Sequence, residues 1–425
     1  MRVLFQAFCL SICSISTQPG SAQSIDRPNI LLLVADDLGY EKVGAYNGLS
    51  ALTPHLDQLA GEGLLFLRAY ASPVCTPSRM SLYTGTYATT HQYTSVLPVH
   101  LGSKDAVDFS QWTTYAQLLG ANGYHTAVTG KWQLAGLEFH PRHCASAGFD
   151  SWCVWQIWRN GQKTRRYWKA TLNEDGKIRD DIQDRFGPDV LTDYVIRQMK
   201  SAQDQGRPFC IQHNMMLPHV PIIETPDDKA ARRAPGLDQM INYMDKQVGL
   251  LLAAINEMGI EENTVVIFIG DNGTQSKEPR RTPQGMVKGG KWTLTDGGMH
   301  VPLMIRYPKV ITAGRKAESL IDITDFFPTI CDLSYTSMED LNGIDGKSFY
   351  PLLINGDYKS REWITGGFEN DYVIFDGEWR YHHNEEELWD CRDLPRETLS
   401  TARSKEAEDA HTRLSEILAE LLAKD

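Results

Sequence analysis

The stretch Ile30-Leu31-Leu32-Leu33-Val34-Ala35 decides the fold, and Asp36-Asp37-Leu38-Gly39 follows it at once. An uninterrupted apolar run of this length is typical of a strand that is buried on both faces, as in a parallel sheet. A second run of the same kind, Thr264 to Ile269, stops at Gly270-Asp271-Asn272-Gly273. The chain therefore predicts two central strands that both end in short polar side chains.

Strands and helices alternate along most of the chain. Residues 124–129 and 208–212 have the composition of two further strands. Before the second apolar run, side chains from Met240 to Ile255 recur at the 3.6-residue spacing of a helix that packs by one face. This alternation predicts an α/β domain with a mostly parallel central sheet flanked by helices. Ligands of such sheets bind beyond the carboxyl ends of the strands, where both acidic clusters lie.

The pattern changes after residue 335. Residues 372–375, 379–381 and 387–389 are short strand-like pieces, and residues 404–424 have the pattern of an amphipathic helix. We therefore expect a main domain over 23–335 and a smaller C-terminal α+β subdomain over 336–425.

Composition places the chain among globular proteins. Of its 425 residues, 42% are hydrophobic and 23% are charged, which excludes collagens, coiled coils and mostly disordered chains. The net charge of −12 argues against broad binding to nucleic acid or to anionic membranes. A local cluster of cations could still bind a small anionic substrate. No stretch beyond the N-terminal region is long and apolar enough for a membrane helix.

The N-terminus has the pattern of a targeting segment. A basic residue precedes the apolar stretch Val3 to Ile15, and small and polar residues follow as far as Ala22. This pattern predicts a secretory signal peptide over 1–22, and so a secreted or periplasmic protein; the alternative is a buried N-terminal helix. Export would permit disulfides, and Cys144 with Cys153 is the only close pair of cysteines outside that segment.

The two acidic clusters have the chemistry of one cation site. Asp36, Asp37, Asp271 and Asn272 offer three carboxylates and one amide oxygen, which suit Ca²⁺ or Mg²⁺. Adjacent carboxylates repel each other unless a positive charge lies between them. The alternative is that Asp-Gly and Asn-Gly only end the strands in turns. Two clusters in equivalent positions of one sheet favour the metal.

The most specific stretch reads Cys75-Thr76-Pro77-Ser78-Arg79-Met80-Ser81-Leu82-Tyr83-Thr84-Gly85. Pro77 suits the first turn of a helix, so Cys75 would lie at a helix N-terminus, where free N–H groups attract an anionic ester. Arg79 could bind the same oxyanion or anchor the reactive side chain. By themselves, these residues suggest a thiolate nucleophile or a buried structural cysteine.

This stretch resembles the signature of the formylglycine-dependent sulfatases, the type I sulfatases of the alkaline-phosphatase-like superfamily. Other segments from about residue 27 to residue 400 resemble the family's motifs in the family's order, so the resemblance implies an alkaline-phosphatase-like fold. They are Asp36-Asp37, Leu56-Asp57-x-Leu59-Ala60, Gly130-Lys131-Trp132-x-Leu134, Pro218-His219-Val220-Pro221, Asp271-Asn272, Lys291 with Asp296-Gly297-Gly298, and Glu387-Leu388-Trp389-Asp390 with Pro395-Arg396-Glu397.

The resemblance implies hydrolysis of a sulfate monoester. A maturation enzyme would oxidise Cys75 to Cα-formylglycine, and one hydroxyl of the hydrated aldehyde would attack sulfur. The modified Cys75, the three aspartates and Asn272 would hold the metal, normally Ca²⁺ with Mg²⁺ also possible. The metal would lower the pKa of the attacking hydroxyl and neutralise sulfate oxygens.

The resemblance also implies roles for the residues around the ester. Arg79 would hold the hydrated aldehyde and Lys131 a sulfate oxygen. His219 and Lys291 would contact the bridging oxygen, with His219 as the acid for the departing alcohol. Taken singly, each of these lysines is also typical of a solvated surface, and His219 of a loop.

Gln133 departs from the family pattern, which has His at this place in Gly-Lys-Trp-His-Leu. In the family that His is the usual candidate base for ejecting sulfate, and a neutral Gln cannot accept a proton. We therefore expect a different base, with His91, His213 and His300 as candidates. The other readings are altered substrate positioning or a slow enzyme.

The segment 152–169 indicates the substrate class. Flat aromatic side chains stack on sugar faces, and cations suit sulfated or carboxylated chains, so we predict a sulfated carbohydrate as substrate. The alternative is an aromatic-rich hairpin that packs on the core. The side chains concerned are Trp152, Trp155, Trp158, Trp168, Arg159, Lys163, Arg165, Arg166 and Lys169.

Two other functions stay open at this point. Members of the superfamily with the same signature hydrolyse phosphonate monoesters or phosphodiesters. A non-catalytic binder of sulfated glycans is the other alternative, and only Gln133 supports it.

Overall fold

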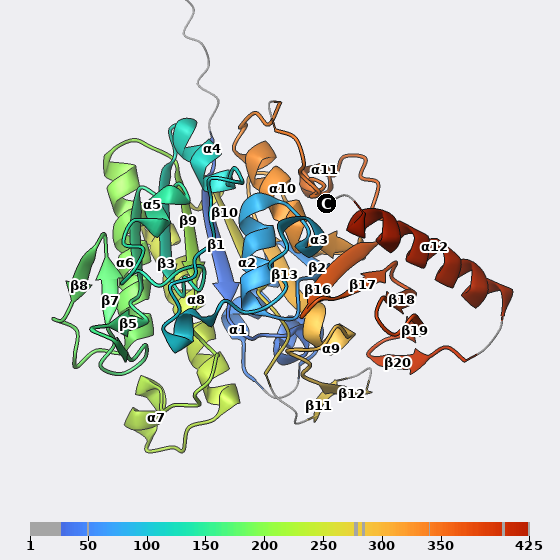
Figure 1. The fold of residues 1–425 in the computed structure, drawn as a ribbon. Coiled ribbons are helices and arrows are strands. Elements are labelled where there is room, and N and C mark those ends of the chain that lie inside the picture. Colours follow the sequence, from blue (N-terminus) through green and yellow to red (C-terminus); the bar gives the residue numbers. More distant parts are fainter. Residues whose placement is uncertain are drawn as a thin grey trace, which may run out of the picture.

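The centre of the protein is a sheet whose middle strands are parallel (Figure 1). The computed structural model describes residues 27–48, 51–275, 279–282, 285–339, 341–401 and 404–423, so the expected signal peptide lies outside the described residues. In spatial order the middle strands are β10 (Thr264–Gly270), β1 (Asn29–Ala35), β9 (Phe209–Asn214), β3 (His125–Gly130) and β4 (Ser151–Trp155).

Further strands extend this sheet on both sides, mostly in antiparallel pairs. On one side these are β13 (His300–Arg306), β2 (Leu64–Tyr70), β14 (Arg315–Ala317) and β15 (Ile321–Asp322); on the other side they are β7 (Leu172–Glu174) and β8 (Lys177–Arg179). Two hairpins lie apart from it, β5 (Trp158–Arg159) with β6 (Gln162–Lys163), and β11 (Pro279–Thr282) with β12 (Gly285–Lys288).

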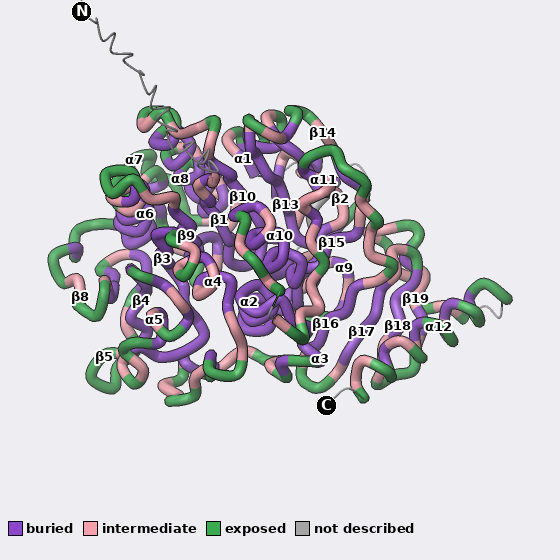
Figure 2. Tube along the Cα trace, turned by 90° about the horizontal axis from the view of Figure 1, so that it is seen from above, coloured by how far each residue is buried: buried purple, intermediate pink, exposed green. Residues whose placement is uncertain are grey.

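Helices cover both faces of the sheet, which explains why the central apolar run has no polar interruption. The central strands are buried along their length (Figure 2). Ile30, Leu32 and Val34 belong to one buried cluster, and Leu31 and Leu33 belong to the cluster on the opposite face. The first cluster includes side chains from α2 (Cys75–Thr84), α4 (Tyr115–Ala121) and α10 (Phe326–Leu333), and the second from α1 (Pro54–Gly61), α6 (Gly187–Asp204) and α8 (Leu237–Glu257). The predicted α/β fold with a mostly parallel sheet is confirmed.

A separate antiparallel sheet forms the C-terminal part, which confirms the predicted α+β subdomain. Helix α12 (Lys405–Leu422) packs on this sheet through Leu414 and Leu418. Before it, α11 (Tyr350–Leu353) packs on the core of the main domain through Leu353 and through Phe349, the residue that precedes the helix. The chain therefore enters the second sheet only at β16. Its strands are β16 (Ile364–Phe368), β17 (Asp371–Phe375), β18 (Trp379–His382), β19 (Glu387–Asp393) and β20 (Arg396–Leu399).

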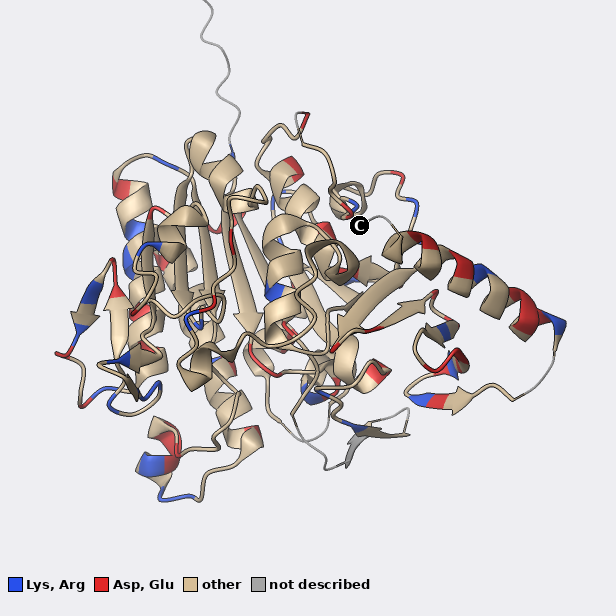
Figure 3. Cartoon of the chain, in the orientation of Figure 1, with Lys and Arg blue, Asp and Glu red and all other residues tan. Residues whose placement is uncertain are grey.

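Burial and charge separate the interior from the periphery. Charged residues lie mainly on the loops and on outer helices such as α12, and the middle of the central sheet carries almost none (Figure 3). Cys144 and Cys153 are buried free thiols in the clusters on opposite faces of the sheet, so they do not form the disulfide that their closeness in sequence suggested.

None of the helices within the described ranges combines the length and apolar character of a membrane span.

Candidate active site

The parallel pairing of β1 and β10 brings the two acidic clusters together. Ala35 pairs with Gly270, so the chain leaves both strands at the same edge of the sheet. The amide of Asp271 then donates to the Ala35 carbonyl at 2.9 Å, and the Asp37 amide donates to Asp271 Oδ1 at 3.1 Å. Asp37 takes a left-handed φ of 67°, which turns the chain across the strand end. Asn272 donates from Nδ2 to Asp37 Oδ1 at 3.0 Å.

Cys75 is the first residue of α2 and faces this acidic cluster. The helix ends at Gly85, whose φ of 67° is left-handed and whose amide donates to the Ser81 carbonyl at 2.8 Å. Cys75 is only 2% exposed, and its Sγ lies 3.5 Å from Asp36 Oδ1. The helix terminus that the signature stretch predicts is therefore next to the predicted cation site.

Lys131 approaches the same two groups from β3. Its Nζ lies 2.7 Å from Asp36 Oδ1 and 3.0 Å from Cys75 Sγ. Gly130 makes this approach possible, because a Cβ on it would lie 1.8 Å from the Asn214 carbonyl oxygen. That oxygen accepts the Lys131 amide at 3.0 Å, which fixes the start of the lysine side chain.

Two further buried cations complete the ring. Arg79 donates from Nη2 to Asp271 Oδ2 at 2.8 Å and from Nη1 to the Lys131 carbonyl at 3.0 Å. The Nζ of Lys291 lies 2.5 Å from Asp37 Oδ1 and 3.8 Å from Cys75 Sγ. Three buried cations thus face three buried carboxylates, and each aspartate has a cationic partner.

Burial and charge shift the pKa values of these groups in different directions. Burial alone would raise the pKa of Asp36, but Lys131, His219 and Arg79 outweigh it and hold that pKa well below its usual range. Burial raises the pKa of Cys75 to about 12, although the lysines oppose the shift. The unmodified side chain is therefore a neutral thiol at neutral pH, which disfavours the thiolate nucleophile.

The oxygen donors fit a hard divalent cation. Asp36 Oδ2, Asp37 Oδ2 and Asn272 Oδ1 are all buried and have no hydrogen-bond partner among the described residues. Buried oxygens without a partner are costly, and a coordinated cation would satisfy them. Ligand atoms of Asp36, Asp37, Cys75 and His219 lie within 4.8 Å of one another. His219 therefore borders the cation site.

His219 is oriented by an arginine that the sequence analysis placed on a substrate platform. Arg166 donates to His219 Nδ1 at 2.8 Å and to the Val220 carbonyl. Nδ1 also lies 2.7 Å from that carbonyl oxygen. Arg166 can only donate to Nδ1, whereas the Val220 carbonyl can only accept from it, so the two contacts fix the orientation of the ring and not the nitrogen that carries the proton. Nε2 is 3.6 Å from Asp37 Oδ2, and burial lowers the His219 pKa to about 4.

A pocket of about 160 Å³ opens over Cys75, and Gln133 forms part of its wall. Gln133 has a φ of 58° and donates from Nε2 to the Leu97 carbonyl at 3.2 Å. His100, which lies three residues after Leu97 and carries no motif, lines the same pocket. The structure places none of the three expected bases on that wall. His91 bonds to Ser81, His213 lies within β9, and His300 stacks between Tyr40 and Tyr70.

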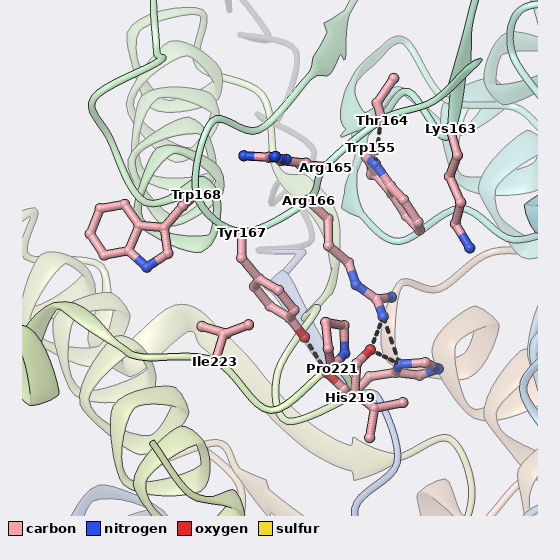
Figure 4. A pocket seen from close by; sticks show the side chains of 11 residues that line it. Trp155, Lys163, Thr164, Arg165, Arg166, Tyr167, Trp168, His219, Pro221 and Ile223 are labelled. Atoms are coloured by element: carbon pink, nitrogen blue, oxygen red, sulfur yellow. Dashed lines mark hydrogen bonds between the residues drawn. The ribbon is translucent and has the colours of Figure 1, made fainter. Parts of the chain in front are cut away.

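A larger pocket of about 710 Å³ adjoins the first (Figure 4). The two share Trp155, Lys163, Arg166, His219 and Val220 as lining residues. Only part of the expected platform lies here. Trp152 and Trp158 line neither pocket, because their indole nitrogens donate to Asn173 Oδ1 and to the Val99 carbonyl in the body of the domain.

Fold and site together define the class of protein. The Sulfatase family profile matches residues 28–335, and the profile described as "N-sulphoglucosamine sulphohydrolase, C-terminal" matches residues 290–424. The chain therefore belongs to the sulfatase family and is a sulfuric ester hydrolase.

Individual relatives agree with this assignment. The chain is 25% identical to the N-acetylgalactosamine-6-O-sulfatase of Bacteroides thetaiotaomicron, over 88% of its own length and 85% of the relative's. It is 31% identical to human arylsulfatase A, over 77% and 68% of the two chains. Among solved structures, Ps i-CgsB superimposes with a TM-score of 0.81 at 24% identity, covering 93% of this chain and 92% of that one. The likeness to Ps i-CgsB shows a shared fold.

Proposed function

We propose that this protein hydrolyses a sulfate monoester of a carbohydrate, with a formylglycine made from Cys75 and a bound divalent cation. One observation carries the proposal: Cys75 Sγ lies 3.0 Å from Lys131 Nζ and 3.5 Å from Asp36 Oδ1, in a pocket whose walls carry further cations. A neutral buried thiol is a poor nucleophile. Its oxidation to the aldehyde supplies, after hydration, a hydroxyl that can attack sulfur.

The side chains around Cys75 have separate tasks in that reaction. Arg79 orients the modified side chain, because it is clamped between Asp271 and the Lys131 carbonyl. Lys131 and Lys291 direct their charges to the space above Cys75 and stabilise negative charge that develops there. His219, whose lowered pKa keeps the ring neutral, donates a hydrogen bond to the departing oxygen, and the cationic Lys291 in the same pocket neutralises the charge that develops there. Asp36, Asp37, Asp271 and Asn272 would hold Ca²⁺, with Mg²⁺ as the alternative, which supplies positive charge to the sulfate oxygens.

His100 is our candidate for the proton acceptor that Gln133 cannot be. It lines the pocket of Cys75, and burial, Lys163 and Lys131 lower its pKa, so the imidazole is neutral at neutral pH. Gln133 bonds to the Leu97 carbonyl and so supports the segment that presents His100. His100, which lies in the short 3-10 helix Pro98–Leu101, would thus take the place of the missing histidine of the family motif.

Several relatives support a carbohydrate as the substrate. The relative from Bacteroides thetaiotaomicron is named an N-acetylgalactosamine-6-O-sulfatase. A structure with a TM-score of 0.80 contains k-i-k-neocarrahexaose, and another with a TM-score of 0.74 contains D-glucosamine-2-N,6-O-disulfate. In this chain the wall of the larger pocket combines tryptophans with cations, which suits a sulfated sugar.

The decisive experiment combines mass spectrometry with a matched assay. We expect the peptide that contains Cys75 to carry formylglycine when the protein is produced with a formylglycine-generating maturation enzyme. The preparation should release sulfate from N-acetylgalactosamine 6-sulfate or another sulfated sugar faster than phosphate from the corresponding phosphate ester. An unconverted thiol together with glycan binding would favour the non-catalytic binder.

A phosphonate monoester or phosphodiester hydrolase stays the second candidate. The phosphonate monoester hydrolase of Agrobacterium radiobacter shares the fold, with a TM-score of 0.67 at 20% identity. Faster cleavage of a phosphonate monoester than of every sulfate ester tested would replace the sulfatase proposal.

We also propose that the protein is exported, to the periplasm or the medium. The pattern of residues 1–22 supports this, and N-terminal sequencing of the mature protein tests it. A mature chain that retains residues 1–22 would contradict the proposal.

A further inference from the structure

We propose that the 710 Å³ pocket binds the sugar unit next to the sulfated one, and that this neighbouring unit carries an anionic group, either a carboxylate or a second sulfate. The inference rests on the proposed function and adds to it the chemistry of the second unit. The pocket is lined mainly by Trp155 and residues 163–168, and among the hydrolytic groups only His219 reaches it.

The position of the pocket suits a substrate that is larger than a single sulfated sugar. Trp155, Arg166 and His219 are walls of both this pocket and the one above Cys75. A sulfate held over Cys75 would therefore have its carrier sugar beside His219, and the next unit would reach the larger pocket, whose wall includes Trp155 and Trp168. Figure 4 shows these side chains around the larger pocket. Cavities of this size accept ligands of the size of common drugs, which is enough for a sugar ring and its substituents.

The walls suit the carbon face of a sugar, and their aromatic rings are held in place. Trp155 donates from Nε1 to Thr164 Oγ1 at 2.8 Å, and the Arg166 guanidinium lies 4.9 Å from the centre of its ring. Trp168 donates from Nε1 to the Glu224 carbonyl at 2.7 Å, with Lys229 Nζ 5.0 Å from its ring centre. Rings already fixed by such contacts lose little conformational entropy when a ligand binds.

The rim of the pocket carries positive charge that the protein leaves unbalanced. Lys163 and Arg165 are exposed, and neither forms an ion pair with any residue that the structure describes. Figure 4 shows the side chains of Lys163 and Arg165 on either side of Trp155. By contrast, the nearby Arg159 forms an ion pair with Asp180 at 2.6 Å. No described carboxylate lines either pocket.

This arrangement is unusual for a chain with a net charge of −12. Lys131, Lys291 and Arg79 already compensate the aspartates and face the sulfate over Cys75. Arg165 lines only the larger pocket and Lys163 lies on the wall that the two pockets share, and both are available to a second anion because no described carboxylate pairs with them. Exposed cations on a pocket rim raise affinity modestly and select between charged and neutral ligands.

The test compares two disaccharides that differ only in the second unit. N-acetylgalactosamine 6-sulfate is linked in one to glucuronate and in the other to neutral glucose, and a third compound carries a second sulfate on the glucose. We expect kcat/KM to be about tenfold higher for each charged disaccharide than for the neutral one. The double variant Lys163→Gln/Arg165→Gln should remove most of that preference, whereas Arg159→Gln, from the same hairpin, should retain it.

Binding to the Cys75→Ala protein, measured by calorimetry with the same disaccharides, separates the two proposals. Tighter binding of the charged compounds that depends on Lys163 and Arg165 supports the inference. If the protein that retains Cys75 nevertheless releases no sulfate from any of the three compounds, the proposed function fails and the inference stands. Release of sulfate at equal kcat/KM from all three compounds overturns the inference and leaves the sulfatase in place. Equal binding of all three to Cys75→Ala overturns it as well.

Discussion

The guanidinium of Arg166 lies 2.8 Å from His219 Nδ1, and this contact fixes the orientation of the imidazole ring. In that orientation Nε2 lies 3.6 Å from Asp37 Oδ2, on the side of the ring that faces the pocket above Cys75. Arg166 is almost fully buried, so its role differs from that of the exposed Arg165. It is a positioning residue for His219.

Replacing Arg166 with Gln should therefore weaken the hydrogen bond from His219 to the departing oxygen. Stabilisation of that oxygen matters most for poor leaving groups, so kcat should fall about tenfold or more for a sugar sulfate and much less for 4-nitrophenyl sulfate. Steady-state kinetics of Arg166→Gln and Arg166→Lys on both substrates measure this difference, with Arg159→Gln as the control. An equal loss on both substrates would show that Arg166 serves only the structure of the pocket.

Gln133 and His100 should act together in the release of sulfate. Gln133→Ala removes the hydrogen bond to the Leu97 carbonyl, and we expect a several-fold slower release of sulfate. His100→Gln removes the proton acceptor and should cost about tenfold or more in kcat. Single-turnover kinetics distinguish this step from substrate binding; His411→Gln on α12 is the control. Unchanged kinetics of Gln133→Ala would make Gln133 a spacer.

Binding of Ca²⁺ should stabilise the fold, even of protein with an unconverted Cys75. A cation would satisfy the buried oxygens of Asp36, Asp37 and Asn272, and a ligand at a hundredfold excess over its dissociation constant adds about 2.7 kcal/mol of stability. Thermal unfolding with Ca²⁺, with Mg²⁺ and with a chelator measures the shift. Asp37→Asn should abolish it and Asp180→Asn should not. A melting temperature that is indifferent to both ions would exclude the site.

Acid should destabilise the protein through its buried neutral histidines. Burial lowers the pKa of His143 from 6.5 to about 4, and this ring accepts a hydrogen bond from Trp132 Nε1 at 2.9 Å. Between these two pH values the unfolded chain binds more protons than the folded one. Stability is therefore complete above pH 6.5 and falls as the pH drops toward 4, by on the order of 3 kcal/mol for this residue.

Denaturant unfolding from neutral pH to about pH 4 tests this slope. Burial lowers the pKa of His91 and His213 to about 3, so they add to the loss over the same range. His143→Gln should show a flatter dependence on pH than the parent protein, even if it is less stable at pH 7. A parallel dependence in the two proteins would contradict the assignment.

Much of the architecture could be predicted from local pattern. The uninterrupted run at Ile30 and its counterpart at Thr264 predicted central parallel strands, because only strands covered on both faces are apolar throughout. The signature after Cys75 predicted where α2 begins. The disulfide suggested for Cys144 and Cys153 does not form, because their proximity in sequence does not reveal that the sheet lies between the two thiols.

The active-site residues could likewise be predicted only in part. The sequence by itself determined the side chains that converge on Cys75, because they follow strand ends and helix starts whose places are set by the α/β topology. Only the tertiary structure decided that Arg166 turns inward to His219, that His100 faces the pocket beside Gln133, and that Lys163 and Arg165 are left without carboxylate partners among the described residues. These contacts join loops whose approach depends on the packing of the whole domain, which no local spacing encodes.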